Sequence, residues 1–259
     1  VGVREGKPFS GTFLGDGHTL TADIRNNTEE QGAAPFRYIK DATIQNLTVA
    51  GTIASNSYHT AGIVGFAEGT NLIENCTVSA TLNISSNYAG GIVGHGLTSN
   101  TTLRGCIFVG AVNGINGDFA NVGGLWGWSD SGTPVLENCL EKGTYTAVVS
   151  MHPMGLQGNK GTITGCYYMN AQMGSPAKAC TVRGAYQVAT TNTGGEVYKP
   201  VTAIDGNTYY TACIVSNIVA LYHCTGSDIK VELPTVTTAD GTVLTSAVAG
   251  SGLSFAAPA

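Results

Sequence analysis

A repeat of about 30 residues constrains this chain more than any other feature. The segments beginning at residues 62, 91 and 124 open with glycine, two apolar residues and glycine, and a polar turn leads to a second apolar strand. That strand starts with Ile or Leu, two polar or small residues, and Cys; looser copies begin at residues 34 and 154. The recurring glycines are Gly65, Gly94, Gly127 and Gly158, and the cysteine position is held by Asn46, Cys76, Cys106, Cys139 and Cys166. A fixed period is typical of solenoids, in which each coil buries its apolar face against the next.

Composition favours β-structure over helix. Only 11% of the 259 residues are charged and 36 are glycine, whereas ordinary globular chains carry about 25% charged residues. Stretches such as residues 43 to 49 (TIQNLTV) alternate apolar and polar side chains, and no repeat shows a helical period. We therefore predict an all-β chain built around a right-handed parallel β-helix, with like residues stacked at the strand spacing of roughly 4.8 Å.

The repeats resemble the GLUG-motif repeats of bacterial surface and secreted proteins, which also occur in the immunoglobulin A1 protease group of metallopeptidases. The matching residues are 62 to 65 (GIVG), 91 to 94 (GIVG) and 124 to 127 (GLWG), and residues 8 to 20 are similar to the lead-in before such repeats. The resemblance covers roughly residues 8 to 170 and implies an extracellular or cell-surface bacterial protein. It implies no catalytic site, because the zinc motif of the peptidases lies outside such repeats, and no His-Glu-x-x-His occurs here.

The pattern changes near residue 180. We expect residues 1 to 180 to form the β-helix, with residues 1 to 33 as its N-terminal cap, and residues 181 to 259 to form a C-terminal β-rich module. Short β-rich runs between Ser-Asn, Thr-Gly-Ser and Ala-Asp-Gly turns resemble the small β-sandwich modules of bacterial surface proteins.

Seven cysteines leave at least one unpaired. The four at the repeat position are expected to form an inward ladder of small apolar side chains, because a linear ladder does not converge as a tetrahedral metal site requires. A disulfide between Cys213 and Cys224 is a further prediction for a secreted chain. We predict neither a metal nor a cofactor.

A second ladder is aromatic. Tyr38, Phe66, His95 and Trp128 hold one place in four consecutive repeats. Exposed rings on one stripe would suit stacking against sugars. Alternatively, the same rings cover a corner or pack beneath a loop.

Carbohydrate-active enzymes also use β-helices, so acidic pairs need attention. Glu74 and Glu137 each lie two residues before a ladder cysteine, two coils apart, with Arg104 between them. Glycoside hydrolysis needs two carboxylates roughly 5 to 10 Å apart. The trio fits an ion-pair stripe or a carbohydrate-binding row as well as a catalytic pair.

Charge and hydropathy exclude some classes of partner, and the remaining functions can be ranked. The net charge of −5 and the lack of a basic run argue against nucleic acid as a partner, and no segment is long and apolar enough to span a membrane. We expect a non-enzymatic structural or adhesion protein that contacts glycans or other surface proteins. The alternatives are a subunit that assembles with its own copies into a filament or surface layer, through the solenoid ends or the C-terminal tail, and a polysaccharide lyase or glycoside hydrolase.

Overall fold

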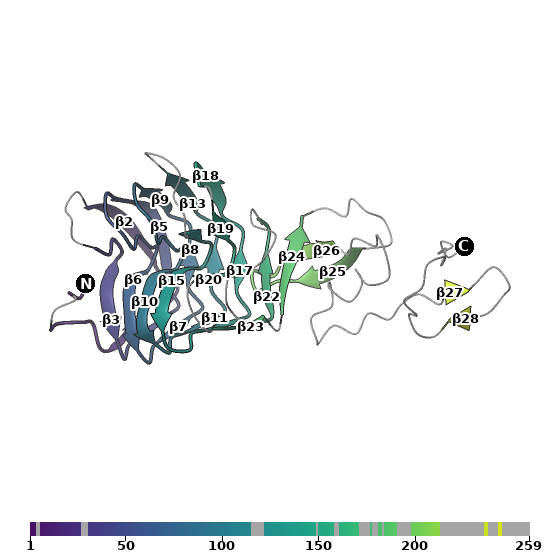
Figure 1. Ribbon diagram of the computed structural model, residues 1–259, viewed down its shortest axis with the longest axis horizontal. Helices are drawn as coiled ribbons and strands as arrows, with labels where there is room; N and C mark the ends of the chain where they lie inside the picture. Colours follow the sequence, from purple (N-terminus) through teal and green to yellow (C-terminus); the bar gives the residue numbers. More distant parts are fainter. Residues whose placement is uncertain are drawn as a thin grey trace.

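The fold is an all-β solenoid of parallel coils (Figure 1). The computed structural model describes residues 1–3, 6–26, 31–114, 122–148, 150–157, 161–170, 177, 181–182, 184–190, 198–212, 236–237 and 243–244. These residues contain no helix. The predicted fold class, with stacked parallel coils, is confirmed.

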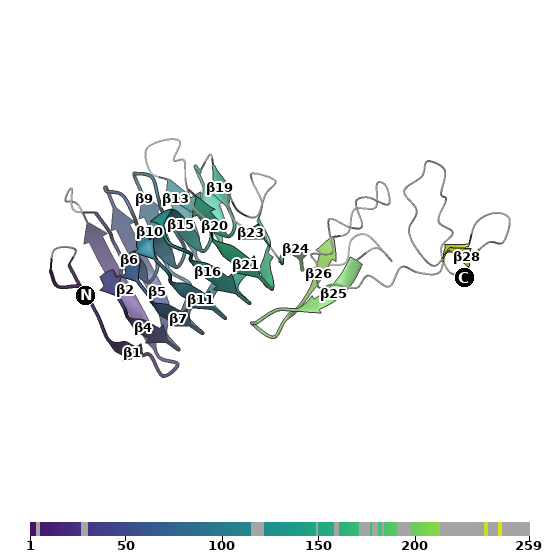
Figure 2. The same ribbon diagram turned by 60° about the horizontal axis from the view of Figure 1, so that its bottom comes forward.

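One wall of the solenoid is a sheet of short parallel strands, one from each coil. Its strands are β1 (Thr12–Leu14), β4 (Thr43–Gln45), β7 (Leu72–Glu74), β11 (Thr102–Arg104), β16 (Val135–Glu137), β21 (Thr162–Thr164) and β23 (Thr181–Val182). Each strand pairs in register with the next, so its central residue lies on an apolar ladder that runs from Phe13 through Ile44 and Ile73 to Val182. Side-on, the strands lie across the long axis of the stack (Figure 2).

In five consecutive coils the wall ends at a sharp corner built on left-handed backbone. We call this set of residues the corner column: Asn46, Asn75, Gly105, Asn138 and Gly165, with φ between 50° and 63°. Asn and Gly tolerate this conformation better than other residues.

The corner column corrects one predicted ladder member. Gln45 pairs with Glu74 and Thr48 with Thr77, so Leu47, not Asn46, occupies the place of Cys76. Asn46 instead aligns with Asn75 and supplies the left-handed corner. The spacing of an apolar residue, two polar residues and Cys, counted from Ile44, also leads to Leu47.

A second wall follows the corner. Its parallel strands are β2 (Thr19–Asn26), β5 (Thr48–Ser55), β8 (Thr77–Val78), β9 (Thr81–Ile84), β12 (Ile107–Phe108), β13 (Ala111–Gly114), β17 (Leu140–Glu141), β18 (Thr144–Thr146), β22 (Cys166–Tyr168) and β24 (Ala185–Ala189). A third wall contains β3 (Phe36–Lys40), β6 (Val64–Gly69), β10 (Val93–Ser99), β15 (Trp126–Ser131) and β20 (Gly155–Gln157). Beside it, the crossing segments pair through β14 (Val122–Gly123), β19 (Met151–His152) and isolated parallel bridges.

The two glycines of each Gly-x-x-Gly motif serve different contacts. At Gly91, a Cβ would lie 2.5 Å from the Phe108 ring, so the first glycine admits a side chain from the opposite wall. At Gly94, a Cβ would lie 2.9 Å from the backbone of His59, so the second glycine admits the crossing segment of the preceding coil. Both positions exclude a side chain by close approach.

The last repeat departs from the predicted glycine register. Trp126 pairs with Gly155 and Trp128 with Gln157, so Gly127 aligns with Leu156. Gly158 therefore does not continue the glycine ladder, and it lies outside the described residues. Gly155 has φ 74°, and a Cβ there would lie 1.5 Å from the Trp126 carbonyl oxygen. In this coil, glycine is therefore required at position 155.

Parallel pairing runs through both predicted boundaries. At the start, β1 and β2 pair in register with β4 and β5, so much of the segment expected as a cap is itself an incomplete coil. At the end, β23 pairs with β21 and β24 pairs with β22, so a division after residue 180 falls within the coiled region. The repeat motif fades there because the Val182 coil carries Ala185 in the cysteine position.

The parallel order ends with an antiparallel hairpin. β25 (Tyr198–Thr202) pairs with β26 (Thr208–Ala212), and β26 pairs with β24. Tyr209 and Val188 pack with Leu140 on the outside of the second wall, and Lys142 lies 3.1 Å from Asp205. The strands β27 (Val236–Thr237) and β28 (Val243–Leu244) form a separate antiparallel pair. Most of the predicted β-sandwich segment, with Cys213 and Cys224, lies outside the described residues.

Candidate binding site on the aromatic face

The structure places the four predicted aromatic residues in one register on the third wall. Tyr38 pairs with Phe66, Phe66 with His95, and His95 with Trp128. Tyr38, Phe66 and His95 are buried, at 4%, 1% and 7% exposure. The stripe is therefore not an open four-ring platform, and of its members only Trp128 is partly exposed. Whether Trp128 binds a ligand stays a prediction.

Crossing segments cover these rings. His59 packs on Phe66 with ring centroids 4.7 Å apart, and it stacks on His95 at 4.3 Å. A Cβ at Gly32 would lie 2.7 Å from the Phe66 ring, so the preceding segment lies over that ring as well. The aromatic stripe is therefore covered by residues of the crossing segments, and we call these covering residues the roof of the stripe.

Two roof residues adopt an unusual backbone conformation. His59 has φ 67° and Tyr88 has φ 66°, and the bridges that pair Ala33 with Thr60 and Ala61 with Gly90 align both with Gly32, at φ 86°. The left-handed region costs a bulky residue about 1 to 3 kcal/mol. The rings of His59 and Tyr88 stack at 5.4 Å with an 11° interplanar angle, and this contact offsets part of that cost.

Five side chains close a cycle of contacts. The Trp128 Nε1–H donates to Asp130 Oδ1 at 2.8 Å, and Asp130 Oδ2 lies 3.1 Å from His95 Nε2. His95 stacks on His59, His59 stacks on Tyr88, and the Tyr88 ring lies 5.0 Å from the Trp128 ring. The cycle fixes Trp128 and Tyr88 against a buried support.

Three partly exposed rings lie together above this support. We call Tyr58, Tyr88 and Trp128 the aromatic surface. Tyr58 is 41% exposed and its ring lies 5.8 Å from that of Tyr88. Sequence reasoning missed Tyr58 and Tyr88 because they belong to crossing segments outside the repeat motif; the available signal was the recurrence of tyrosine 30 residues apart in Ser-Tyr-His and Asn-Tyr-Ala.

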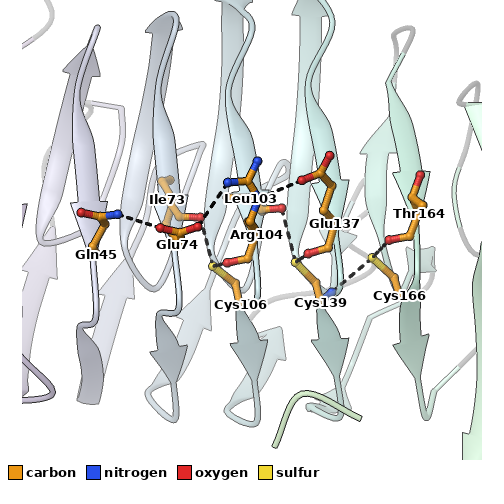
Figure 3. A network of polar contacts seen from close by, with 10 residues as sticks. All are labelled: Gln45, Ile73, Glu74, Leu103, Arg104, Cys106, Glu137, Cys139, Thr164 and Cys166. Carbon is orange, nitrogen blue, oxygen red and sulfur yellow. Dashed lines mark hydrogen bonds and ion pairs between the residues drawn. The ribbon is translucent and has the colours of Figure 1, made fainter. Parts of the chain in front are cut away.

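A polar row lies on the outer face of the first wall (Figure 3). The Gln45 amide donates to Glu74 at 2.7 Å, and the Arg104 guanidinium donates to Glu74 at 3.2 Å and to Glu137 at 2.9 Å. Arg104 thus joins the two carboxylates that the sequence placed two coils apart. The trio forms an ion-pair stripe, and both carboxylates are engaged by the same cation.

A third carboxylate, on the third wall, is also held by hydrogen-bond donors. Glu68 accepts hydrogen bonds from the Tyr38 hydroxyl and from Lys40. These two donors lower the pKa of Glu68. A carboxylate stabilised as the anion is a poor general acid.

The cysteine ladder lies on the inner side beneath the polar row. Cys76, Cys106, Cys139 and Cys166 are fully buried and free. Three of their thiols donate to carbonyl oxygens of the preceding coil, as in Cys106 to Ile73 at 3.3 Å and Cys139 to Leu103 at 3.6 Å (Figure 3). Burial raises the pKa of the Cys106 and Cys166 thiols. Among the described residues, no three His, Cys, Asp or Glu side chains are grouped as a metal ion would need.

One buried carboxyl was not anticipated. Glu141 occupies the interior place held by Val78 and Phe108 in the two preceding coils. Its Oε1 accepts hydrogen bonds from the Tyr145 hydroxyl at 2.8 Å and the Gly143 N–H at 2.7 Å. Burial raises the pKa of Glu141 to about 7, although these donors act in the opposite direction. The repeat pattern assigns an apolar side chain to each interior strand position. It therefore gives no signal for a carboxyl at one of them.

Comparison with known proteins found a solved structure of similar architecture. A crystal structure described as that of "a putative immunoglobulin A1 protease" from Bacteroides ovatus is similar, with a TM-score of 0.50 and 17% identity over 76% of each chain. At this identity the similarity supports the solenoid fold alone. No family model matches the chain, so its GLUG assignment stays a prediction. No curated protein matches either. Among the described residues, no helix has the length and apolar character of a membrane span.

Proposed function

We propose that this chain is a non-enzymatic adhesion or structural protein of the bacterial cell surface or exterior, which contacts glycans through the aromatic surface. The observation that carries the proposal is the group of three partly exposed rings, whose centroids lie 5.0 and 5.8 Å apart, supported by the buried rings of His59 and His95. Ring faces of this kind stack on pyranose rings at little entropic cost, because the side chains are already fixed. The extracellular setting rests on the resemblance of the repeats to surface proteins.

The partners of three surface carboxylates favour a binding function over hydrolysis. Glu74 and Glu137 share Arg104, and Glu68 is held by Tyr38 and Lys40. A hydrolase instead needs one carboxyl kept protonated as an acid and another free to act as base or nucleophile. These three carboxylates lack that division of roles.

A glycan array probed with purified protein tests the proposal. Trp128→Ala and Tyr58→Ala should each weaken binding to the best glycan about ten-fold, which is the scale of one aromatic contact. Ile204→Ala serves as the control, because Ile204 is also an exposed apolar residue, at 48%, but lies in the turn between β25 and β26. Thermal unfolding would establish that all three variants fold. Absence of glycan binding by the wild-type chain, or binding that both ring variants leave unchanged, would refute the proposal.

A second candidate function is self-assembly through the N-terminal end of the solenoid. Phe13 and Leu20 belong to interior ladders but are 37% and 40% exposed, whereas Ile44 and Val49 in the next coil are fully buried. Within the described residues, the outer edges of β1 and β2 carry no paired strand, and free parallel edges with apolar faces favour association. Sedimentation over a concentration series would test this: Leu20→Asp should dissociate any oligomer, and a wild-type chain that stays monomeric would refute it.

A further inference from the structure

Asp130 gives the aromatic surface a charged rim. We propose that this surface recognises glycans bearing a free, protonated amine, with Asp130 and the ring faces as the cation-recognition elements. The inference rests on the proposed function and specifies the ligand class of the same site. It combines three features: the electron-rich rings, the orientation of the carboxylate, and the charge around it.

The rings provide the first feature. The faces of tyrosine and tryptophan rings carry partial negative charge and attract ammonium groups within about 6 Å of the ring centre. Tyr58, Tyr88 and Trp128 come from three different coils, and each is partly exposed. A cation on this surface can therefore contact more than one ring face.

The carboxylate provides the second feature. Asp130 is held by Trp128 Nε1 on one oxygen and lies beside His95 Nε2 with the other, yet its side chain is 52% exposed. Its geometry is therefore set before a ligand arrives, and solvent still reaches it. A preorganised carboxylate at the edge of an aromatic ring adds a charge-assisted hydrogen bond to the cation–π attraction of the ring face.

The surrounding charge provides the third feature. The partner of Asp130 among the described ion pairs is a histidine, whereas Glu68, Glu74, Glu137 and Asp205 are paired with Lys or Arg. The chain as a whole carries a net charge of −5. A cationic sugar is therefore favoured here over a neutral one, and an anionic sugar is disfavoured.

Two oligosaccharides of the same backbone test the inference: the tetramer of β-1,4-linked glucosamine and its fully N-acetylated counterpart. Binding of the wild-type chain is measured by calorimetry at about pH 6 in low salt, where amines are protonated. We expect the glucosamine tetramer to bind about five-fold more tightly, as one partly exposed charge contact allows. Asp130→Asn should bring the ratio of the two affinities close to one.

Asp23→Asn is the matched control. It removes the same charge from an exposed position on β2, where Asp23 pairs with Arg25, and it should keep the wild-type ratio. Equal binding of both tetramers by the wild-type chain would overturn the amine preference while leaving glycan binding intact. A five-fold ratio that persists in Asp130→Asn would overturn the assignment of Asp130 as a cation-recognition element. Failure of both tetramers and of every arrayed glycan to bind would instead refute the proposed function itself.

Discussion

The Oδ1 atom of Asn75 lies beneath Gly105 of the next coil, 2.6 Å from where a Cβ on Gly105 would stand. Asn138 and Gly165 repeat the relationship at 2.4 Å. In these coil pairs the asparagine side chain occupies space that only glycine leaves free. At these two places the presence of asparagine in one coil is linked to glycine in the next, whereas Asn46 is followed by Asn75.

Replacing Gly105 should cost more than backbone strain alone. Gly105→Ala places a Cβ at φ 60° against Asn75, whereas Gly17→Ala meets φ 77° with open space around it. The left-handed conformation costs about 1 to 2 kcal/mol in both variants, and we expect the Gly105 variant to lose about 1 kcal/mol more from crowding. Chemical denaturation measures the difference. Adding Asn75→Gly should relieve the extra loss, and equal losses in the two alanine variants would contradict the steric account.

The second glycine of the repeat motif should control the aromatic roof. Gly94→Ala forces a Cβ to within 2.9 Å of the His59 backbone, so the crossing segment must shift. We expect a loss of about 1 to 3 kcal/mol in the free energy of unfolding and a change in tryptophan fluorescence as Trp128 loses its support. Gly11→Ala is the control, because its nearest neighbour would be a Phe9 ring atom at 3.8 Å. A Gly94 variant with wild-type fluorescence and stability would contradict this role.

Glu141 should make stability depend on pH. The unfolded carboxyl ionises near pH 4.5, while the folded one ionises at about 7. Between these values the folded chain binds the extra proton, so the free energy of unfolding should fall as pH rises, by about 3 kcal/mol in total, and this contribution should level off above pH 7. Denaturation midpoints at pH 4.5 and 8 measure the slope. Glu141→Gln should flatten it, whereas Glu137→Gln on the outer face should keep the wild-type slope; a Glu141 variant with an unchanged slope would be evidence against the assignment.

The ladder thiols should be chemically silent in the folded chain. Cys76, Cys106, Cys139 and Cys166 have no exposed surface, so a reagent in solution cannot reach their sulfur atoms while the chain is folded. A water-soluble thiol reagent should therefore modify at most the remaining three of the seven cysteines until denaturant is added. Mass spectrometry would identify the modified residues. Rapid labelling of Cys106 under native conditions would show that the interior opens.

The period of the sequence was sufficient to predict the stack, because pairing in register requires like residues at like places. It also identified the aromatic stripe from Tyr38 to Trp128, since these residues immediately follow or align with the repeat glycine. It left open whether the rings form an exposed platform or pack beneath a loop, because the path of the crossing segments that cover them is set by contacts between coils. The burial of Tyr38, Phe66 and His95 agrees with the second alternative. Tyr88 and His59 were missed because they belong to those crossing segments.

Single-residue register was the other limit. Asn46 was predicted at the cysteine position, although the repeat spacing counted from Ile44 places Leu47 there; the first coil has no cysteine that would fix the register. The left-handed φ of Asn46 places it at the corner instead. The buried position of Glu141 was not predicted, because a single charged residue at an apolar ladder position does not change the period of the repeat.

The corner column also bears on how such a chain changes length. Five consecutive coils turn by the same backbone conformation, at Asn46, Asn75, Gly105, Asn138 and Gly165, so these coils meet through equivalent surfaces. Duplication or loss of one whole coil preserves those surfaces, whereas an insertion of a few residues inside a wall breaks every ladder it crosses. Genetic variation is therefore expected to change this solenoid in units of one coil and to collect shorter insertions in the crossing segments, beside the aromatic surface.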